Sequence, residues 1–344
     1  MSLFIDACYG KPTARTPIWL MRQAGRYMPE YRAIRAKADF WQLCHDPDLA
    51  TEVTLQPIQA FGMDAAILFS DILIPLPEVG FEVRFDEGKG PVLPNPIKKA
   101  TDVEKFIAVP MSESLSNVGK AVRQIVKALP SNTPLIGFAG APFTLASYLI
   151  EGGSSKEFMK TKSFLHQEPK AAHVLFQKLT DVVIDFLSFQ VDSGCKAVQI
   201  FDSWAGCLDP DDYAIWGLFY TKQIVEALQK KNVPVIVFAK GTHAYMDVVA
   251  QCNADAYGVD WTTRLSQARA MVGPKAALQG NLDPGKLLAP WPEIEKSVRK
   301  ILDQAGNGTG HIFNLGHGIY QHTPVDHVKQ LTDFIKEKSH LWRA

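Results

Sequence analysis

The segment Met21–Arg32, MRQAGRYMPEYR, concentrates arginines in a chain whose formal net charge is zero. A guanidinium stays charged at any working pH, and its forked donors match a carboxylate in bidentate fashion. Because the chain has no overall charge, an anionic ligand must be recognised by a few placed cations. Arg22, directly behind an apolar run, is the best candidate for a carboxylate site, whereas Arg32 and Arg35 fit a surface cluster paired with nearby acids.

Single polar residues stand at the ends of other apolar runs. Asp71 follows AAILFS, and a carboxylate buried beside arginines would stay ionised and accept N–H groups or stabilise positive charge. A helix N-cap is the alternative, although the Ile-Leu-Ile-Pro that follows is not helix-like. Ser203, in FDSWAG, lacks the GxSxG elbow of hydrolases, so we expect it to hydrogen-bond rather than attack. His317 lies between two glycines that leave room for a ligand, but a lone histidine is often structural.

The segment Gly137–Ser155, GFAGAPFTLASYLIEGGSS, predicts a small-residue loop and then a short apolar helix that holds Tyr148. Free N–H groups at a helix start favour an anion. No GKS or GKT follows, so the loop is not a nucleotide P-loop. The pattern alone fits a Tyr148 in the site and a Tyr148 in the core about equally well.

Metal and cofactor motifs are missing from the sequence. It has no HxH, HExxH or closely paired cysteines, so we expect no metal site. Signatures for nucleotides, flavins and pyridoxal phosphate are also missing, and Lys240 is the only well-placed candidate for a Schiff base. We therefore expect a reaction without a cofactor.

The elements that must position these groups are short, nearly continuous apolar runs separated by helical patterns. The runs are Ile18–Met21, Ala65–Phe69, Leu135–Phe138, Ala197–Phe201, Val235–Phe238, Ala256–Val259, Ala276–Leu278 and Ile312–Leu315. Runs of this kind are typical of parallel strands that are covered on both faces. Eight strand–helix units predict an α/β fold, a (β/α)8 TIM barrel with its active site at the C-terminal ends of the strands. A doubly wound sheet is the alternative, but no GxGxxG follows the first run.

Nothing in the sequence divides the chain, so we expect a single barrel domain spanning 1–344. The range 72–96 is rich in proline and glycine and predicts an excursion, a hairpin or a lid near the site. No apolar run reaches the roughly 18 residues of a transmembrane helix, and the N-terminus lacks a secretory pattern. The five cysteines form no CxxC pair. We expect a cytoplasmic protein that binds neither membrane nor nucleic acid.

Five stretches together resemble the uroporphyrinogen decarboxylase family, in its order and spacing. They are PIWLMRQAGRYMPEYR, AAILFSDIL, GFAGAPFTLASYLIEGG, QIFDSWAG and FNLGHGI. The likeness runs from about Pro17 to the last helix. It implies a (β/α)8 barrel, a homodimer with facing clefts, and removal of carboxyl groups from the four acetate side chains of uroporphyrinogen III, giving coproporphyrinogen III for haem biosynthesis. It also implies that neither a metal nor a prosthetic group takes part.

The resemblance assigns roles residue by residue. It implies that Asp71, Arg22 and Tyr148 are catalytic, with Asp71 accepting the pyrrole N–H groups and stabilising the protonated ring. The substrate-binding residues that it implies are Arg22, Gln23, Arg26, Arg35, Asp71, Tyr148, Phe201, Ser203 and His317. The identity of the first proton donor stays open between Arg22, a substrate carboxyl and a water molecule.

Two other functions compete with this interpretation. A corrinoid or thiol methyltransferase of the same superfamily relies on a zinc site with a His-x-Cys pair, which this sequence lacks. A catalytically silent tetrapyrrole carrier on the same fold is the second, and the presence of Arg22, Asp71, Tyr148 and His317 argues against it.

Overall fold

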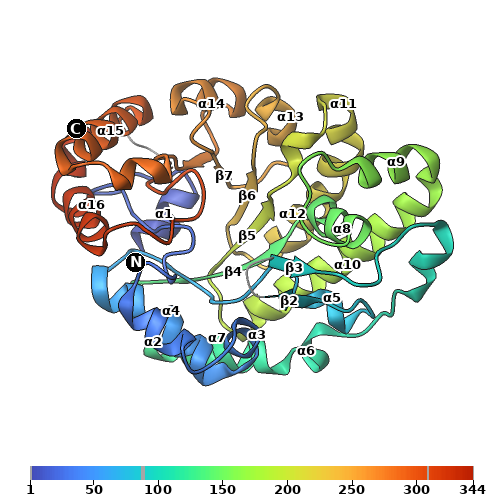
Figure 1. Cartoon of the computed structure of the whole chain (residues 1–344). Helices are drawn as coiled ribbons and strands as arrows, with labels where there is room; N and C mark the ends of the chain where they lie inside the picture. The colour runs from blue at the N-terminus through green and yellow to red at the C-terminus, as the bar shows by residue number, and fades with distance from the viewer. Residues whose placement is uncertain (1, 87–89, 308–309, 344) are drawn as a thin grey trace.

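Seven parallel strands form the centre of the computed structural model (Figure 1), which describes residues 2–86, 90–307 and 310–343. They are β1 (Ala66–Ile67), β4 (Leu135–Gly140), β5 (Ala197–Asp202), β6 (Val235–Ala239), β7 (Ala256–Gly258), β8 (Ala277–Gln279) and β9 (His311–Ile312). The strands pair in that order, so each strand lies beside the next one along the chain. The predicted α/β fold with a parallel sheet is confirmed, and seven of the eight predicted runs overlap a strand.

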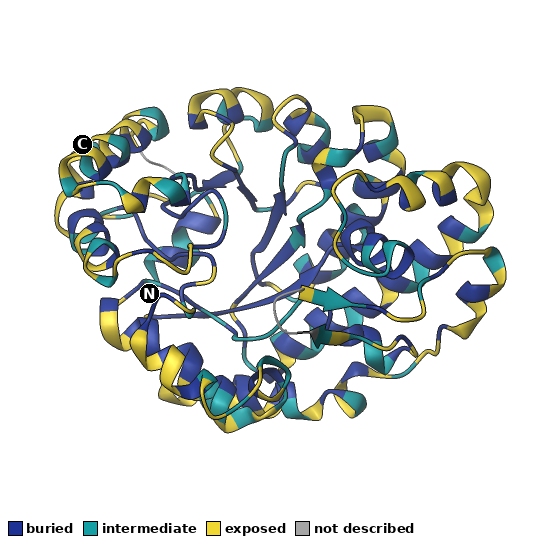
Figure 2. Ribbon diagram, viewed as in Figure 1, coloured by how far each residue is buried: buried dark blue, intermediate teal, exposed yellow. Residues whose placement is uncertain are grey.

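The sheet is curled and its two faces pack against different cores. Residues alternate along each strand: Ile136 and Ile236 join an inner cluster with Trp19 and Phe4, whereas their neighbours join the outer core beneath the helices. Helix α1 (Leu3–Cys8) contributes three residues to the inner cluster and so lies across its N-terminal end. Figure 2 shows the strands buried and the surrounding helices exposed only on their outer faces.

Helices surround the strands and connect them. Those between α1 and the fifth strand are α2 (Pro29–Arg35), α3 (Phe40–His45), α4 (Pro47–Phe61), α5 (Pro75–Glu78), α6 (Met111–Ser114), α7 (Ser116–Ala128), α8 (Pro142–Glu151), α9 (Met159–Gln167) and α10 (Pro169–Ser193). Those that follow are α11 (Pro210–Tyr213), α12 (Phe219–Gln229), α13 (Met246–Ala250), α14 (Leu265–Val272), α15 (Trp291–Ala305) and α16 (Val325–Lys338).

Several helices begin where an aspartate precedes a proline. Asp46 accepts N–H groups at the start of α4, and Asp209 does so at the start of α11. The aspartate satisfies orphan donors of the first turn, and proline suits a position whose N–H has no partner. Among the described residues, no helix is both long and apolar enough to cross a membrane.

The predicted first strand, Ile18–Met21, is not a strand but a single bridge, in which Ile18 pairs in parallel with Phe313. The Trp19 N–H donates to the Phe313 carbonyl (3.3 Å), and on the other side the Asp64 N–H donates to the Ile18 carbonyl (2.8 Å). The segment therefore lies between β9 and the residues that lead into β1.

Side chains replace the regular ladder in this segment, and this is the physical reason for the difference. Three of its backbone N–H groups donate to side-chain oxygens: Ile18 to Asp64 (2.8 Å), Leu20 to Gln23 (3.3 Å) and Met21 to Asn314 (2.9 Å). A group bonded to a side chain cannot also extend the pairing between strands.

The excursion over 72–96 contains the predicted hairpin and also the short helix α5, which was not predicted. Strands β2 (Arg84–Asp86) and β3 (Gly90–Val92) pair in antiparallel fashion, while residues 87–89 lie outside the described part. The hairpin continues onto α8, since the Leu93 N–H donates to the Gly152 carbonyl (3.0 Å) and the Ile97 N–H to the Leu149 carbonyl (2.8 Å). The excursion is thus fastened to the helix that carries Tyr148.

Candidate active site

Arg22 lies at the tip of the turn after the Ile18 bridge. Its backbone is left-handed, with φ of 59°. Non-glycine residues adopt this conformation rarely, and it clusters at functional sites. The Arg22 side chain is exposed and packs against Gly318, where an added Cβ would lie 2.5 Å from Arg22 Cδ. The turn therefore directs a guanidinium to the C-terminal side of the sheet.

Gln23 lies beneath this turn and is buried, with 1% of its surface exposed. Its Oε1 accepts from the Leu20 N–H (3.3 Å), and its Nε2 donates to the Ala65 carbonyl (3.2 Å). Its own carbonyl accepts from the Tyr27 hydroxyl (2.7 Å). Both ends of the side chain thus bind backbone, so Gln23 shapes the turn that presents Arg22.

Asp71 lies just beyond β1 and is partly buried. Its Oδ1 accepts from the Leu73 N–H (2.9 Å), and no hydrogen bond from a described residue reaches Oδ2. Burial raises the pKa of Asp71, while the Leu73 hydrogen bond and the charge of Arg22 oppose the rise. The carboxylate therefore has one oxygen held in place and one oxygen available to a ligand.

Tyr148 lies on α8 and is half-buried, with its ring centroid 5.9 Å from that of Trp204. Burial raises the pKa of Tyr148 to about 12; the charge of Asp71 adds to this rise, and that of Arg22 opposes it. The charges of Asp71 and Arg22 therefore both act on the Tyr148 hydroxyl. The phenol keeps its proton at neutral pH and can act as a hydrogen-bond donor.

Phe201 ends the inner face of β5 and forms an aromatic wall. Its ring lies edge-on to Phe138 (5.6 Å between centroids) and to Phe238 (6.0 Å). Ser203 follows two residues later, is half-buried, and makes no side-chain hydrogen bond with any described residue. A free hydroxyl next to an apolar wall suits a ligand with both an apolar body and polar substituents.

His317 lies in the loop after β9 and is partly buried between aromatic rings. Its centroid is 6.2 Å from that of Phe238 and 6.4 Å from that of Trp261. Burial lowers the pKa of His317 to about 4; the charges of Arg22 and Lys240 add to the effect and Asp260 opposes it. The imidazole is therefore neutral near pH 7 and offers one donor and one acceptor.

Seven of the nine predicted residues fall into two groups, while Gln23 lies beneath the Arg22 turn and Ser203 follows β5. Arg22, Asp71, Tyr148, Phe201 and His317 belong to the network of contacts and charge effects at the C-terminal side of the sheet. Arg26 and Arg35 instead line a neighbouring hollow of about 510 Å³ together with Arg32, Ala36, Gln321 and His322. Arg35 also donates to the Ala38 carbonyl (2.5 Å).

Sequence reasoning did not assign Lys240 or Trp261 to the site. The Lys240 ammonium lies 5.9 Å from the centroid of the Trp261 ring, and no carboxylate of the described residues lies within ion-pair distance of it. Both residues follow strands, β6 and β7, so their places at strand ends were the available signal.

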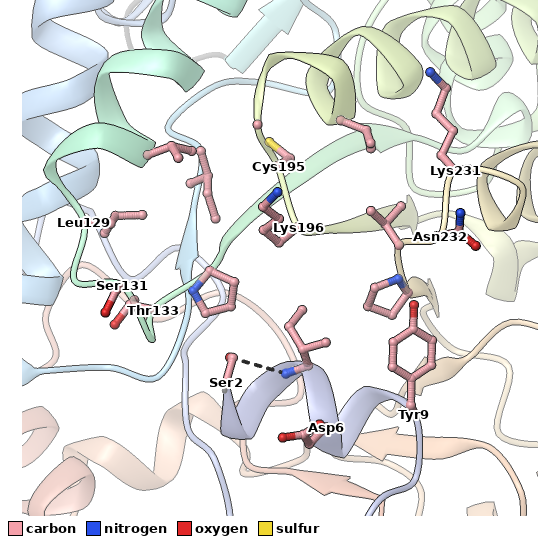
Figure 3. A pocket seen from close by; sticks show the side chains of 18 of the residues that line it. Ser2, Asp6, Tyr9, Leu129, Ser131, Thr133, Cys195, Lys196, Lys231 and Asn232 are labelled. Carbon is pink, nitrogen blue, oxygen red and sulfur yellow. Dashed lines mark hydrogen bonds between the residues drawn. The ribbon is translucent and has the colours of Figure 1, made fainter.

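A further hollow, of about 620 Å³, lies at the opposite end of the sheet (Figure 3). It is enclosed by α1 and by the segments that enter β4, β5 and β6, and its lining includes Ser2, Asp6, Tyr9, Lys196 and Lys231. None of the predicted site residues lines it. Within the described ranges, no three His, Cys, Asp or Glu side chains are grouped so as to hold a metal ion.

Known proteins resemble this chain over nearly its whole length. The sequence profile of the family described as uroporphyrinogen decarboxylase (URO-D) matches residues 1–338. A uroporphyrinogen decarboxylase of Magnetococcus marinus is 47% identical over 341 residues, which are 97% of this chain and 96% of the relative. One of Chloroflexus aurantiacus is 48% identical over 337 residues, 97% of this chain and 95% of the relative.

A solved structure supports the fold alone. A methyltransferase from Methanosarcina mazei superposes with a TM-score of 0.79 over 97% of each chain, at 17% sequence identity. At that identity the likeness concerns the arrangement of strands and helices and not the reaction.

Proposed function

The chain belongs to the uroporphyrinogen decarboxylase family, and we propose that its site removes the carboxyl groups of the four acetate side chains of uroporphyrinogen III, giving coproporphyrinogen III. It is thus a carboxy-lyase of haem biosynthesis. The observation that carries the assignment to this site is the placement of Asp71, which keeps one carboxylate oxygen free beside Arg22 and Tyr148.

The chemistry explains why these groups suffice. Loss of CO₂ leaves a carbanion-like centre that needs an electron sink, and a protonated pyrrole supplies one. The enzyme must then hold a polyanion, stabilise a cationic pyrrole and allow protons to reach the ring. We assign cation stabilisation and acceptance of pyrrole N–H groups to Asp71, and carboxylate binding to Arg22. No cofactor is needed in this scheme.

The remaining predicted residues take binding roles. Tyr148 donates a hydrogen bond at the edge of the site, and Ser203 and His317 contact polar substituents while Phe201 supports the macrocycle. Arg26 and Arg35, in the adjoining basic hollow, contact carboxylates that extend outward. Gln23 contributes through the backbone that it holds.

We further propose that the sheet closes as a (β/α)8 barrel in one domain spanning 1–344, with the bridged segment Ile18–Met21 in the place of the remaining strand. The bridge of Ile18 to Phe313 and the hydrogen bond from Asp64 to Ile18 support closure, since they join the first segment to both edges of the sheet. We propose a homodimer in the cytoplasm, with the two clefts facing each other, on the ground of family membership.

The product profile tests this function. Anaerobic incubation with uroporphyrinogen III, without added cofactor, is expected to yield hepta- to tetracarboxylate products in order. An unchanged number of carboxylates would leave the silent carrier as the better interpretation. Treatment of the protein with a chelator tests the methyltransferase interpretation. If activity is lost on chelation and restored by zinc, the cofactor-free scheme is wrong.

A further inference from the structure

Asp202 is the last residue of β5 and is fully buried, with 0% of its surface exposed. Alternation along the strand turns Phe201 to the inner face and Asp202 outward, toward α8. Its Oδ1 accepts from the Thr144 hydroxyl (2.7 Å), whereas its Oδ2 is buried without a partner among the described residues. Such a carboxyl needs an explanation, because buried polar atoms are nearly always hydrogen-bonded.

The Thr144–Asp202 hydrogen bond joins two elements that carry site residues. Thr144 lies in the first turn of α8, one turn before Tyr148. Its hydroxyl oxygen also accepts from the Trp204 N–H (3.3 Å), which fixes the backbone just after Ser203. One hydroxyl therefore connects the end of β5 to the helix that holds Tyr148.

The surroundings of Asp202 disfavour its charged form. The titratable groups that face it are Tyr213 of α11, Tyr245 before α13 and Cys207, none of which is a cation. Lys240 donates its backbone N–H to the Asp202 carbonyl (3.1 Å). Burial raises the pKa of Asp202 to about 7, and the hydrogen bond from Thr144 opposes the rise. A buried carboxylate without a cation is costly, so a bound proton is favoured.

We propose that Asp202 is a positioning residue that, through Thr144, holds Tyr148 and Ser203 in their places at the site, and that its neutral form is the one that does so. This role rests on the proposed function, because Tyr148 and Ser203 are assigned to the site there. Asp202 itself faces away from the inner core and does not touch the substrate.

Two matched pairs of variants test the role. Asp202→Asn keeps the shape and the neutral charge, and its amide oxygen can still accept from Thr144, so we expect kcat and KM within about twofold of wild type. Asp202→Ala removes the acceptor, and we expect kcat/KM to fall about tenfold or more, as a small misplacement of site groups does. Thr144→Val should lose activity similarly, whereas Thr144→Ser, which keeps the hydroxyl, should restore it.

The pH dependence of stability distinguishes this role from passive packing, because a residue that only packs would not change that dependence. The pKa of Asp202 lies above its ordinary value of 3.8. The folded state therefore holds the proton more tightly, and stability falls as pH rises from about 4 to about 7. His317 acts in the opposite direction over the same window, so the test is the difference between proteins: we expect the ratio of the Asp202→Asn urea midpoint to the wild-type midpoint to increase from about pH 4 to about pH 7. Asp211→Asn, an exposed control on α11, should retain the wild-type slope.

Three results would overturn the proposal. If Asp202→Asn is folded but as inactive as Asp202→Ala, the ionised form of Asp202 is required. If Thr144→Val is folded and has the kcat and KM of wild type, the Thr144–Asp202 hydrogen bond does not position the site. This variant is the deciding test if Asp202→Ala does not fold. If the stability of Asp202→Asn depends on pH as that of wild type does, the folded state does not hold a proton at Asp202 more tightly than the unfolded state. The denaturation arm uses no substrate, so it stays informative even if wild type fails to decarboxylate uroporphyrinogen.

Discussion

Gly318→Ala should displace the Arg22 side chain without unfolding the protein. Gly318 is not among the glycines with positive φ, so alanine is compatible with its backbone. The added Cβ would lie 2.5 Å from Arg22 Cδ, 2.9 Å from Cγ and 3.1 Å from Nε. Ordinary carbon contacts are about 3.5–4.0 Å, so the Arg22 chain must move by about 1 Å.

The expected loss of activity follows from this displacement of the Arg22 side chain. A misplacement of about 1 Å costs on the order of 100-fold in rate, which corresponds to about 2.7 kcal/mol. The obstructing atoms belong to a flexible side chain, so we expect only about 1 kcal/mol of lost stability. The assay is anaerobic decarboxylation followed by chromatographic separation of products by carboxylate number, with thermal unfolding in parallel. Gly285→Ala is the control, because the three atoms nearest to its added Cβ all belong to the Asp283 side chain, the closest at 3.2 Å.

A double-mutant cycle decides whether the effect passes through Arg22. Gly318→Ala should cost little further activity in an Arg22→Ala background, because the displaced group is already gone. Wild-type kcat/KM in the single variant would refute the reasoning, since it would mean that the position of Arg22 is unimportant. An equally large loss in both backgrounds would move the effect to the neighbouring His317.

Other perturbations test separate parts of the structure. Asp71→Asn keeps the shape but removes the charge, and we expect kcat to fall by more than 100-fold, from about 3 kcal/mol of lost electrostatic stabilisation; near-normal kcat would remove Asp71 from the mechanism. His317 has a pKa of about 4 against an ordinary 6.5. Its neutral form stabilises the fold fully above about pH 6.5, and this stabilisation, up to about 3 kcal/mol, is lost as pH falls toward 4. His317→Gln should flatten that part of a pH–denaturation curve, and an unchanged curve would contradict the assignment. Asp64 accepts from Arg15 Nη1 (2.7 Å) and from the Ile18 N–H (2.8 Å). Asp64→Asn should therefore lower the free energy of unfolding by about 2 kcal/mol, measured by urea titration, and wild-type stability would show that this pair contributes little.

Much of the fold could be predicted because a parallel strand covered on both faces leaves a continuous apolar run. Leu135–Phe138 and Val235–Phe238 are runs of this kind, and both contain strands. The first run, Ile18–Met21, has the same composition but bonds largely to side chains, one of them on Asn314 at the far end of the chain. Composition within a short run carries no information about such a distant partner.

The site was predictable where a polar residue directly follows a strand, as with Asp71 and His317. What a single sequence could not predict is the direction of each side chain. Gln23 stands beside Arg22 in sequence, yet its amide binds backbone beneath the turn. In the sequence, Asp202 is one more polar residue at the end of a predicted strand. Only the packing shows that its side chain points away from the inner core. Lys240 follows the predicted strand Val235–Phe238 closely in the sequence, but its place over Trp261 depends on the neighbouring strand.

The bridge between Ile18 and Phe313 has a consequence for the order in which the site is built during protein synthesis. Arg22 leaves the ribosome before every other residue of the site. Its turn, however, is held by Asn314 and its side chain rests on Gly318. A growing chain that lacks these late residues cannot yet hold Arg22 in place, since contacts so distant in sequence form only after the intervening chain exists. Arg22 is therefore the first residue of the site to be made and among the last to be positioned, so an unfinished chain does not have an assembled site.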